Sequence, residues 1–267
     1  MKNSRQKQVL KNQIAIITGS SGILGQRFCK LLSVNGAKVI AVDKIKVKND
    51  TFENHENISF VKCDITSEKS VKNLVSDIIR KFGRIDILVN NAATKTNKLK
   101  NFFYPFEKYE YSTWKDVMSV NLDAAFLLSK YVGNEMQKKR IAGKIIYISS
   151  IYGILGPDHR IYQKGKFQNI KMGTPAVYSA SKSALIGLTK YLATYYGHIG
   201  IRVNSITPGG IEGEQNSIFK KNYSKRVPLG RMGKEHEIEG ALLFLVSDES
   251  SYITGQNLIV DGGLSSW

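Results

Sequence analysis

The stretch IAIITGSSGILG, residues 14 to 25, joins an apolar run to a glycine-rich turn. The apolar run, residues 14 to 18, predicts a strand. Glycines follow at positions 19, 22 and 25, where the chain must turn into a helix, and glycine permits positive φ and close approach of the backbone to a ligand. The exposed N–H groups of such a helix start attract a pyrophosphate. A plain strand-to-helix turn would explain the same glycines, so the rest of the chain has to decide.

The same alternation of strand and helix continues along the chain. Further strands are predicted at residues 38–43, 58–64, 85–93, 143–150, 201–210 and 256–263. Helices are predicted at residues 24–36, 67–83, 112–138, 178–197 and 234–248. Ser67 and Gly83 are the expected caps of the second helix, and Gly36 closes the first.

This alternation predicts the fold class. Strands that are apolar throughout and separated by helices indicate a parallel sheet covered on both faces. We expect an α/β protein with a single doubly wound parallel-sheet domain over residues 13–267, preceded by a basic tail at 1–12. Ligands are expected beyond the carboxyl ends of the strands.

The composition excludes several other classes of protein. A length of 267 residues with 42% hydrophobic content is normal for a globular domain. No apolar run approaches the roughly 18 residues of a membrane span, and the N-terminus lacks the apolar stretch of a signal peptide. Cys29 and Cys63 fall in segments predicted as core, so we expect reduced thiols in a cytoplasmic protein. No cysteine joins the isolated histidines at ligand spacing, so no metal site is expected.

The formal net charge is +17 and comes mostly from lysine. Nucleic acid is one partner that would explain such a charge. The basic residues are scattered, however, and form no stripe with aromatic partners, so no nucleic-acid partner is expected. A lysine-rich background composition or an anionic small-molecule substrate explains the charge more simply.

The second predicted strand ends in Asp43, eighteen residues after the last glycine of the turn. A carboxylate there can accept hydrogen bonds from the adenosine ribose hydroxyls and would repel a 2′-phosphate, which favours NAD over NADP. Lys44 and Lys46 follow and could soften that preference, and a turn-capping role would explain Asp43 without a cofactor. Asp64 and Ile65 stand where an adenine could lie, although Asp64 is equally well explained as a turn residue.

Another candidate site lies in PAVYSASKSALIG, residues 175 to 187, where Tyr178 and Lys182 stand four positions apart. Residues at this spacing share one face of a helix. The pair is either an ordinary helix face or a proton-transfer device. The stretch alone leaves both interpretations open.

Several motifs, in this order and spacing, resemble the short-chain dehydrogenase/reductase family. They are TGSSGILG at 18–25, NNAA at 90–93, ISS at 148–150, the Tyr178–Lys182 pair, NSITPGG at 204–210 and VDGG at 260–263. The resemblance covers about residues 13 to 263. It implies a Rossmann fold and an NAD(P)-dependent oxidoreductase that interconverts a hydroxyl and a ketone by hydride transfer.

The resemblance also implies catalytic roles. Ser150 matches the family's substrate-orienting serine, Tyr178 its general acid/base, and Lys182 the lysine beside that tyrosine. Asn121 matches the asparagine that completes a proton-relay tetrad. A strand-end cap would explain Ser150 alone, and a hydrogen bond at a helix kink would explain Asn121 and is compatible with the relay.

Cofactor contacts follow from the same motifs and from the two aspartates. Asn90 with Ala92 matches the adenosine side, and residues 208–211 match the turn over the nicotinamide. The full set is Gly19, Ser21, Gly22, Ile23, Leu24, Gly25, Asp43, Asp64, Ile65, Asn90, Asn91, Ala92, Ala93, Tyr178, Lys182, Pro208, Gly209 and Ile211.

The chemistry of a tyrosine beside a lysine agrees with the implied roles. The Lys182 ammonium would favour the phenolate of Tyr178 and lower a pKa that is normally about 10. A tuned phenol removes the proton of an alcohol while hydride leaves its carbon, or donates a proton in the reverse direction. In this setting we favour the proton-transfer device.

The chain departs from the family's pattern in the glycine spacing, in NNAA, and at Gly213, where a threonine often stands. Larger departures are predicted substrate loops at about 94–111, 154–174 and 211–230. Two of these loops are basic and suggest an anionic substrate such as a sugar phosphate or nucleotide-linked sugar. A solvated charged surface explains the same residues equally well. They are His159, Arg160, Lys164, Lys166, Lys171, Lys220, Lys221, Lys225 and Arg226.

These features lead to a ranked set of functions. The 154–174 insert and the C-terminal segment look like a bacterial subgroup associated with flagellin modification and nonulosonic sugar biosynthesis. We therefore expect an oxidoreductase acting on a carbohydrate or anionic sugar. The alternatives are a 3-oxoacyl- or steroid-type ketone reductase and a non-catalytic cofactor sensor. The family commonly forms dimers or tetramers, so a homodimer or homotetramer is expected. The aromatic stretch at 101–114 could wall the substrate site, although core or subunit packing is the safer interpretation.

Overall fold

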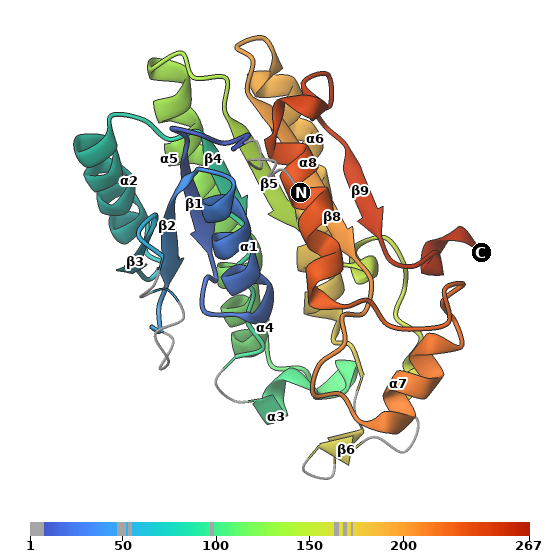
Figure 1. Cartoon of the computed structure of the whole chain (residues 1–267). Coiled ribbons are helices and arrows are strands. Elements are labelled where there is room, and N and C mark those ends of the chain that lie inside the picture. Colours follow the sequence, from blue (N-terminus) through green and yellow to red (C-terminus); the bar gives the residue numbers. More distant parts are fainter. Residues whose placement is uncertain are drawn as a thin grey trace, which may run out of the picture.

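The computed structural model describes residues 8–46, 52, 55–96, 99–162, 166–167, 170–171 and 173–267, with the backbone alone at 166–167 and 170–171. Parallel strands form one seven-stranded sheet in the order β3-β2-β1-β4-β5-β8-β9 (Figure 1). The strands are β1 Ile14–Thr18, β2 Lys38–Asp43, β3 Ile58–Lys62, β4 Ile87–Asn90, β5 Lys144–Ile148, β8 Arg202–Pro208 and β9 Asn257–Val260. The predicted α/β class with a parallel sheet is confirmed.

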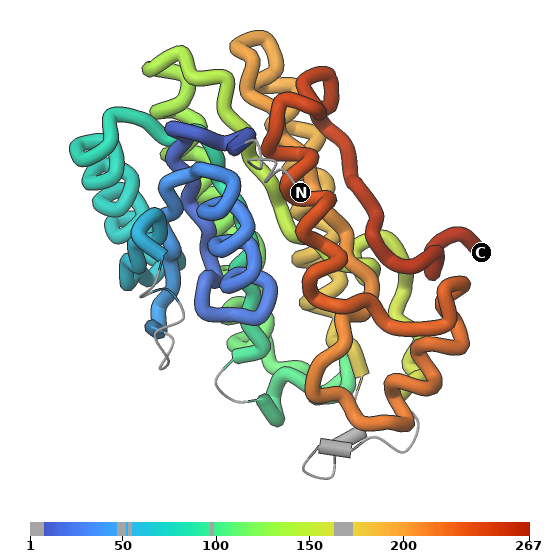
Figure 2. Tube along the Cα trace, viewed as in Figure 1, coloured from blue at the N-terminus to red at the C-terminus, as the bar shows by residue number. Residues whose placement is uncertain are grey.

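The order of the strands reverses at β1. β1 pairs with β2 on one side and with β4 on the other, so the chain builds one half of the sheet before it crosses to the second half. Figure 2 follows this path from blue through green to red. A reversal of this kind opens a crevice at the carboxyl ends of the strands, where ligands of such sheets bind.

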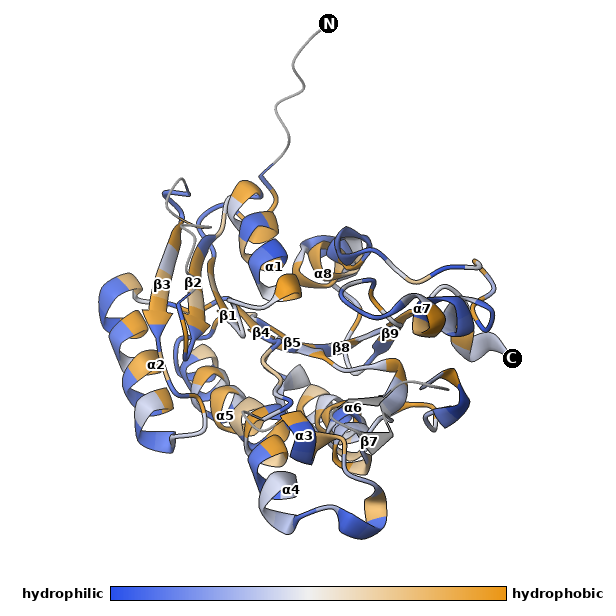
Figure 3. Ribbon diagram, turned by 90° about the horizontal axis from the view of Figure 1, so that it is seen from below, coloured by the Kyte–Doolittle hydropathy of each residue, from blue (hydrophilic) through white to orange (hydrophobic). Residues whose placement is uncertain are grey.

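Helices cover both faces of the sheet (Figure 3). One face carries α1 (Ile23–Val34) and α8 (Glu239–Val246). The other face carries α2 (Glu68–Phe82), α4 (Tyr111–Met118), α5 (Ala124–Lys138) and α6 (Ala176–Gly197). Successive strand residues point to opposite faces, so neighbours such as Ile16 and Ile17 belong to two separate hydrophobic clusters. The sheet therefore has a core on each side.

The edge strands differ from the central ones. Residues of β1, β4, β5 and β8 are buried throughout. The outer strands β3 and β9 are partly exposed, so the expected cover of the sheet on both faces is incomplete at its two edges.

The predicted caps of α2 are confirmed. The Ser67 hydroxyl accepts a hydrogen bond from the backbone N–H of Ser70 at 3.3 Å. Gly83 ends the helix with φ of 74°, in the left-handed region that glycine adopts without steric cost. Gly36, with φ of 98°, follows α1 in the same way.

The helix predicted at 112–138 is interrupted. α4 is followed by a π-helical turn, η2 (Ser119–Asp123), before α5 begins at Ala124. A π-helical turn widens the helix locally and is frequent at functional sites. Here the turn contains Asn121.

Short elements occupy the predicted loop insertions and the C-terminal region. At the carboxyl end of the sheet, Figure 1 shows α3 and α7 on the same side of the molecule. The short elements are α3 Leu99–Phe102, η1 Phe106–Lys108, η3 Ile151–Gly153, η4 His159–Tyr162, β6 Lys166–Phe167, β7 Ile170–Lys171, α7 Ser217–Ser224, η5 Glu235–Ile238, η6 Asp248–Ser250 and η7 Leu264–Ser266. The helix predicted at 234–248 is thus composed of η5 and α8.

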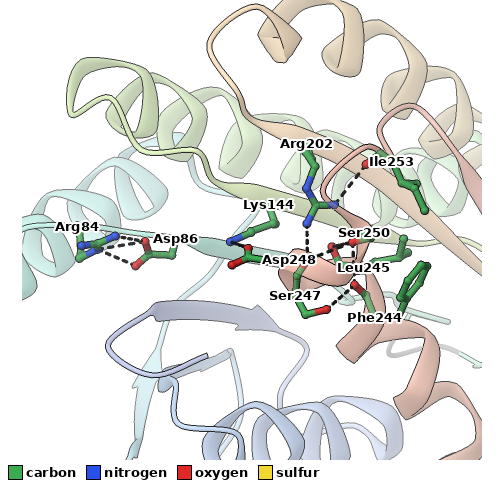
Figure 4. A network of polar contacts seen from close by, with 10 residues as sticks. All are labelled: Arg84, Asp86, Lys144, Arg202, Phe244, Leu245, Ser247, Asp248, Ser250 and Ile253. Carbon is green, nitrogen blue, oxygen red and sulfur yellow. Dashed lines mark hydrogen bonds and ion pairs between the residues drawn. The ribbon is translucent and has the colours of Figure 1, made fainter. Parts of the chain in front are cut away.

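The opposite, amino end of the sheet carries a set of polar contacts, in which Asp86, Lys144 and Arg202 are buried (Figure 4). The Asp86 carboxylate binds the Arg84 guanidinium and accepts from the backbone N–H of Ile14 at 2.8 Å. The Arg202 guanidinium donates to the Ser247 carbonyl at 2.9 Å, and the Lys144 ammonium lies 3.6 Å from Asp248. These contacts tie the starts of the central strands to α8 and to the loop that follows it.

In the described part of the chain, no helix combines the length and apolar character needed to cross a bilayer. Cys29 and Cys63 are both buried and unpaired, as predicted. Burial raises the pKa of both thiols. Among the described residues, no three histidine, cysteine or acidic side chains are grouped closely enough to hold a metal ion.

Candidate active site

The glycine turn between β1 and α1 is tightly packed, both within itself and against the segment after β4. Gly19 adopts φ of 63°, and a Cβ there would lie 2.7 Å from the Cα of Ala92. A Cβ on Gly25 would lie only 2.1 Å from the carbonyl oxygen of Gly19. No side chain caps the start of α1 at Gly22, so its first N–H groups stay available to an anion. The cradle suits the pyrophosphate of a dinucleotide.

Asp43 lies at the end of β2 and faces this turn. One carboxylate oxygen accepts from the backbone N–H of Ser21 at 3.0 Å, and the other accepts from the N–H of Ile45 at 3.1 Å. The Ser21 hydroxyl donates to the Ile45 carbonyl in return. Asp43 is therefore a turn-capping residue, and its negative charge lies beside the cradle.

Asp64 is occupied by its own turn. Its carboxylate accepts from the hydroxyl and the backbone N–H of Thr66, at 2.7 and 3.1 Å, and pairs with the Lys44 ammonium at 3.0 Å. The Thr66 hydroxyl and Lys44 hold the pKa of Asp64 below its usual range. Ile65 is buried in the core on the α5 side of the sheet. The turn explanation of Asp64 is thus the one that the contacts support.

The segment after β4 closes one wall of the crevice. The Asn91 amide donates to the carbonyls of Thr18 and Gly19, at 2.9 and 3.1 Å. The backbone N–H groups of Asn91 and Ala92 both donate to the Thr18 hydroxyl at 3.1 Å. These bonds fix Asn91 and Ala92 against the glycine turn.

Asn90 does not lie where it was expected. Its amide donates to the hydroxyl of Ser129 on α5 at 3.3 Å, and the residue is buried on that face of the sheet. The expectation that Asn90 lines the adenosine side is therefore wrong. Strand alternation is the reason, because Asn90 and Asn91 point to opposite faces.

α6 and β5 bring Tyr178, Lys182 and Ser150 together. All three side chains line one pocket at the carboxyl end of the sheet. The Lys182 ammonium lies 5.9 Å from the centre of the Tyr178 ring and donates to the Ile148 carbonyl at 2.7 Å. Gly153 allows η3 to pack closely against α6, since a Cβ there would lie 2.9 Å from the backbone of Lys182.

Ser150 has the capping role that was considered and also lines the pocket, and Asn121 is buried within the π-helical turn. The Ser150 hydroxyl caps η3 by accepting from the N–H of Tyr152 at 3.3 Å. It also hydrogen-bonds the Tyr178 hydroxyl, which by itself lowers the pKa of that tyrosine. The Asn121 side chain accepts from the N–H of Thr94 at 2.9 Å and donates to the Ser181 hydroxyl at 3.1 Å. Asn121 thus joins the π-helical turn to α6 and to the loop after β4.

The expected lowering of the Tyr178 pKa is wrong. Burial raises the pKa of Tyr178, and the Ser150 hydroxyl offsets only part of that rise. The neighbouring Lys182 is itself deeply buried, which lowers its pKa to about 8. Burial favours the neutral form of both groups. Sequence spacing shows that the two residues are neighbours, but it does not show how deeply they lie.

The turn after β8 forms the wall opposite Tyr178. The N–H of Gly209 donates to the Val260 carbonyl at 2.9 Å, and the N–H of Gly210 donates to the hydroxyl of Tyr223 on α7. The N–H of Gly213 donates to the Gln215 side chain at 2.7 Å. Pro208, Gly209 and Ile211 line the pocket, as Leu24, Asn91 and Ala93 do on the other side.

The pocket has a volume of about 600 Å³. Aromatic and apolar side chains dominate its lining outside the catalytic candidates. They include Phe102, Phe103, Ile151, Tyr152, Ile161, Tyr162, Phe219, Tyr223 and Met232. Phe102 and Phe103 belong to the aromatic stretch at 101–114, so part of that stretch does wall the site. Sequence analysis singled out none of the other aromatic residues in this list.

Three basic residues of the loops at 154–174 and 211–230 form ion pairs with acidic side chains. Arg160 and Arg226 both pair with Asp158, at 2.9 and 3.5 Å, and Lys220 pairs with Glu212 at 3.0 Å. None of the described basic residues of these two loops lines the pocket, although Lys95 of the loop at 94–111 does. The Lys164 residue and the side chains of Lys166 and Lys171 lie outside the described residues.

Known proteins resemble this chain over nearly its whole length. A family model described as enoyl-(acyl carrier protein) reductase matches residues 18–265. The 3-oxoacyl-(acyl-carrier-protein) reductase FabG of Salmonella typhimurium is 35% identical over 261 residues, covering 95% of this chain and 98% of that protein. The Thermotoga maritima enzyme of the same name is 34% identical over 264 residues, covering 96% of this chain and 98% of that protein.

Solved structures also resemble this chain over nearly its whole length. A short-chain dehydrogenase from Leptospira borgpetersenii with bound NAD+ has a TM-score of 0.88 and 35% identity, covering 99% of this chain and 97% of that one. A short-chain dehydrogenase/reductase from Burkholderia xenovorans has a TM-score of 0.81 and 29% identity, covering 97% and 98%. The fold, the dinucleotide cradle and these relatives agree: the chain belongs to the short-chain dehydrogenase/reductase family and is an NAD(P)-dependent oxidoreductase.

Proposed function

We propose that this enzyme reduces the ketone of a 3-oxoacyl thioester. The observation that carries the proposal is the lining of the pocket, in which aromatic and apolar side chains outnumber the polar ones. The polar lining includes Lys95, Glu214, Gln215 and Asn216. Burying an acyl chain against the apolar part of this lining is favourable. The names of the FabG relatives point to the same substrate class.

In this proposal the catalytic residues act on one carbonyl oxygen. A nicotinamide dinucleotide held at the glycine turn and at the turn after β8 would supply the hydride that the carbonyl carbon receives. Tyr178 donates its hydroxyl proton to the oxygen as the carbonyl double bond opens, and Ser150 donates a hydrogen bond to the same oxygen. Its raised pKa keeps Tyr178 protonated at neutral pH, which suits a proton donor. Lys182 and Asn121 position the tyrosine and connect it to the loop after β4.

A sugar substrate is the second candidate. The sugar-modifying subgroup suggested by the insert has no support among the relatives described above. Its remaining basis is the basic loop chemistry, and three of the described basic residues, Arg160, Lys220 and Arg226, pair with acidic side chains. We therefore rank the acyl substrate first.

The experiment is a comparison of substrate classes with the purified enzyme. Oxidation of NADH and NADPH is followed with 3-oxoacyl thioesters of increasing chain length, with 2-enoyl thioesters, and with nucleotide-linked keto sugars. We expect the largest kcat/KM for a 3-oxoacyl thioester, with KM falling as the chain lengthens. Turnover of the keto sugar alone would reverse the ranking, and turnover of the enoyl thioester alone would move the chemistry to a carbon–carbon double bond.

We propose NAD as the preferred cofactor. The Asp43 carboxylate lies beside the glycine cradle, where it would meet the ribose hydroxyls of NAD and repel the 2′-phosphate of NADP. Lys44, the nearest candidate for a compensating cation, is paired with Asp64. The charge next to the cradle is therefore negative.

Replacing Asp43 with serine is expected to shift the preference toward NADPH. The ratio of kcat/KM for NADH to that for NADPH should fall by about tenfold to a hundredfold, the scale of one charged hydrogen bond. Steady-state kinetics with both cofactors measures this ratio. Asp77→Ser is the matched control, because that carboxylate is exposed on α2 and pairs with Arg80, and its ratio should stay near the wild-type value. A wild-type enzyme that prefers NADPH would contradict the assignment.

We also propose a homodimer or homotetramer. The exposed face of α5 and α6 carries large apolar side chains, among them Phe126, Tyr191 and Tyr195, and the two tyrosine rings stack with centroids 6.1 Å apart. Ile259 is exposed on the edge strand β9. Apolar surface of this kind marks interaction sites between proteins. Sedimentation equilibrium measures the mass of the assembly.

A further inference from the structure

The segment between Ser150 and Tyr178 brings three hydroxyl groups to one wall of the substrate pocket. The hydroxyls of Tyr162 and Thr174 lie 2.8 Å apart and form a hydrogen bond. The Tyr152 hydroxyl lies beside this pair; it is buried and has no hydrogen bond of normal geometry to the described residues. Tyr152, Tyr162 and Thr174 all line the pocket that contains Tyr178.

Counting protons shows that this wall has a donor to spare. The Tyr162–Thr174 pair has two hydroxyl protons and uses one of them in its mutual bond. The Tyr152 hydroxyl is buried and lies close enough to both hydroxyls to interact with them. An oxygen atom of a ligand in the pocket can accept the proton that the pair leaves over.

The wall is held in place by α7. The Tyr162 ring packs against Phe219 with centroids 5.1 Å apart, and Phe219 stacks on Tyr223 at 5.9 Å. The Asn222 amide donates to the Ile161 carbonyl at 3.4 Å. The Tyr223 hydroxyl in turn accepts from the turn after β8. The hydroxyls are therefore fixed relative to Tyr178 and to the glycines of that turn.

We propose that Tyr152, Tyr162 and Thr174 form a second oxygen-binding point that recognises the thioester carbonyl while Tyr178 and Ser150 hold the ketone. The inference rests on the proposed function. It makes the insert a specificity element, which selects substrates with a second oxygen close to the ketone. Ketones with a single oxygen would offer no acceptor to the proton that the Tyr162–Thr174 pair leaves over.

A pair of substrates that differ only in this oxygen tests the proposal. One is the 3-oxobutyryl thioester of N-acetylcysteamine. The other is the corresponding thioether, in which a methylene group replaces the thioester carbonyl. Each is measured with the wild-type enzyme and with Tyr152→Phe, Tyr162→Phe and Thr174→Val. We expect each substitution to lower kcat/KM for the thioester by about tenfold, mainly through KM, and to leave the thioether unchanged.

Tyr109→Phe is the matched control, because it removes another buried tyrosine hydroxyl without a hydrogen-bond partner, outside the pocket lining. It should change neither substrate. Equal losses on thioester and thioether would assign the hydroxyls a structural role and overturn the proposal, as would no loss on either. A wild-type enzyme that reduces the thioester and the thioether equally well overturns the second oxygen-binding point alone. A wild-type enzyme that does not reduce the thioester overturns the proposed function together with it.

Discussion

Replacing Tyr178 with phenylalanine is expected to lower kcat by about a thousandfold to ten-thousandfold, the upper part of the range for losing a general acid. The substitution removes only the hydroxyl, and the ring keeps its packing against Phe102, Val117 and Val177. The affinity for NADH should stay within about twofold of the wild-type value, since the cradle is formed by other elements. Steady-state kinetics and fluorescence titration of NADH measure the two quantities.

The outcome separates catalysis from folding. A thermal unfolding midpoint near that of the wild-type protein shows that the variant is folded. Retained turnover would remove Tyr178 from the mechanism and return the Tyr178–Lys182 pair to an ordinary helix face. Loss of NADH binding together with turnover would instead assign Tyr178 a structural role in the cofactor site.

Replacing Gly25 with alanine is expected to destroy the dinucleotide cradle. The new Cβ would lie 2.1 Å from the carbonyl oxygen of Gly19 and 2.8 Å from the Cα of Ser20, which are backbone atoms that cannot move without opening the turn. Overpacking of this severity costs about 3 kcal/mol or more. We expect NADH affinity to fall by at least about a hundredfold, the equivalent of that cost. Isothermal titration with NADH and a thermal unfolding curve measure both effects.

Gly22→Ala provides the comparison for this prediction. A Cβ on Gly22 would meet its nearest neighbour, the Gly19 carbonyl, at 3.4 Å, and φ there is −77°, which any residue adopts. The Gly22 variant should therefore bind NADH nearly as well as the wild-type enzyme. Equal damage from the two substitutions would mean that the turn is sensitive to any side chain, and the specific role of Gly25 would be lost.

Much of this architecture could be predicted from the sequence, because it depends on local patterns. Apolar runs locate the strands, and the caps at Ser67 and Gly83 locate the ends of α2. The motif spacing brings Ser150, Tyr178 and Lys182 to one pocket, as expected. Each of these features is determined by residues close together in the chain or by the order of strands in a parallel sheet.

What the sequence could not provide depends on burial and on side-chain direction. The π-helical turn around Asn121 has no local signature in a segment that is helical on both sides. The rise in the Tyr178 pKa depends on the depth of the pocket. The basic loops were expected to surround an anion, but Asp158 engages Arg160 and Arg226. The direction in which a charged side chain of a loop points depends on its partners, and these are known only from the structure.

The 28 positions that separate Ser150 from Tyr178 have a practical consequence for protein engineering. The two ends of this segment adjoin β5 and α6, and among its described residues Tyr152, Ile161, Tyr162 and Thr174 line the substrate pocket. The segment can therefore be exchanged between relatives while the sheet and helices that carry it stay the same. A laboratory seeking new ketone selectivities would begin by grafting here and would leave the hydride-transfer machinery untouched.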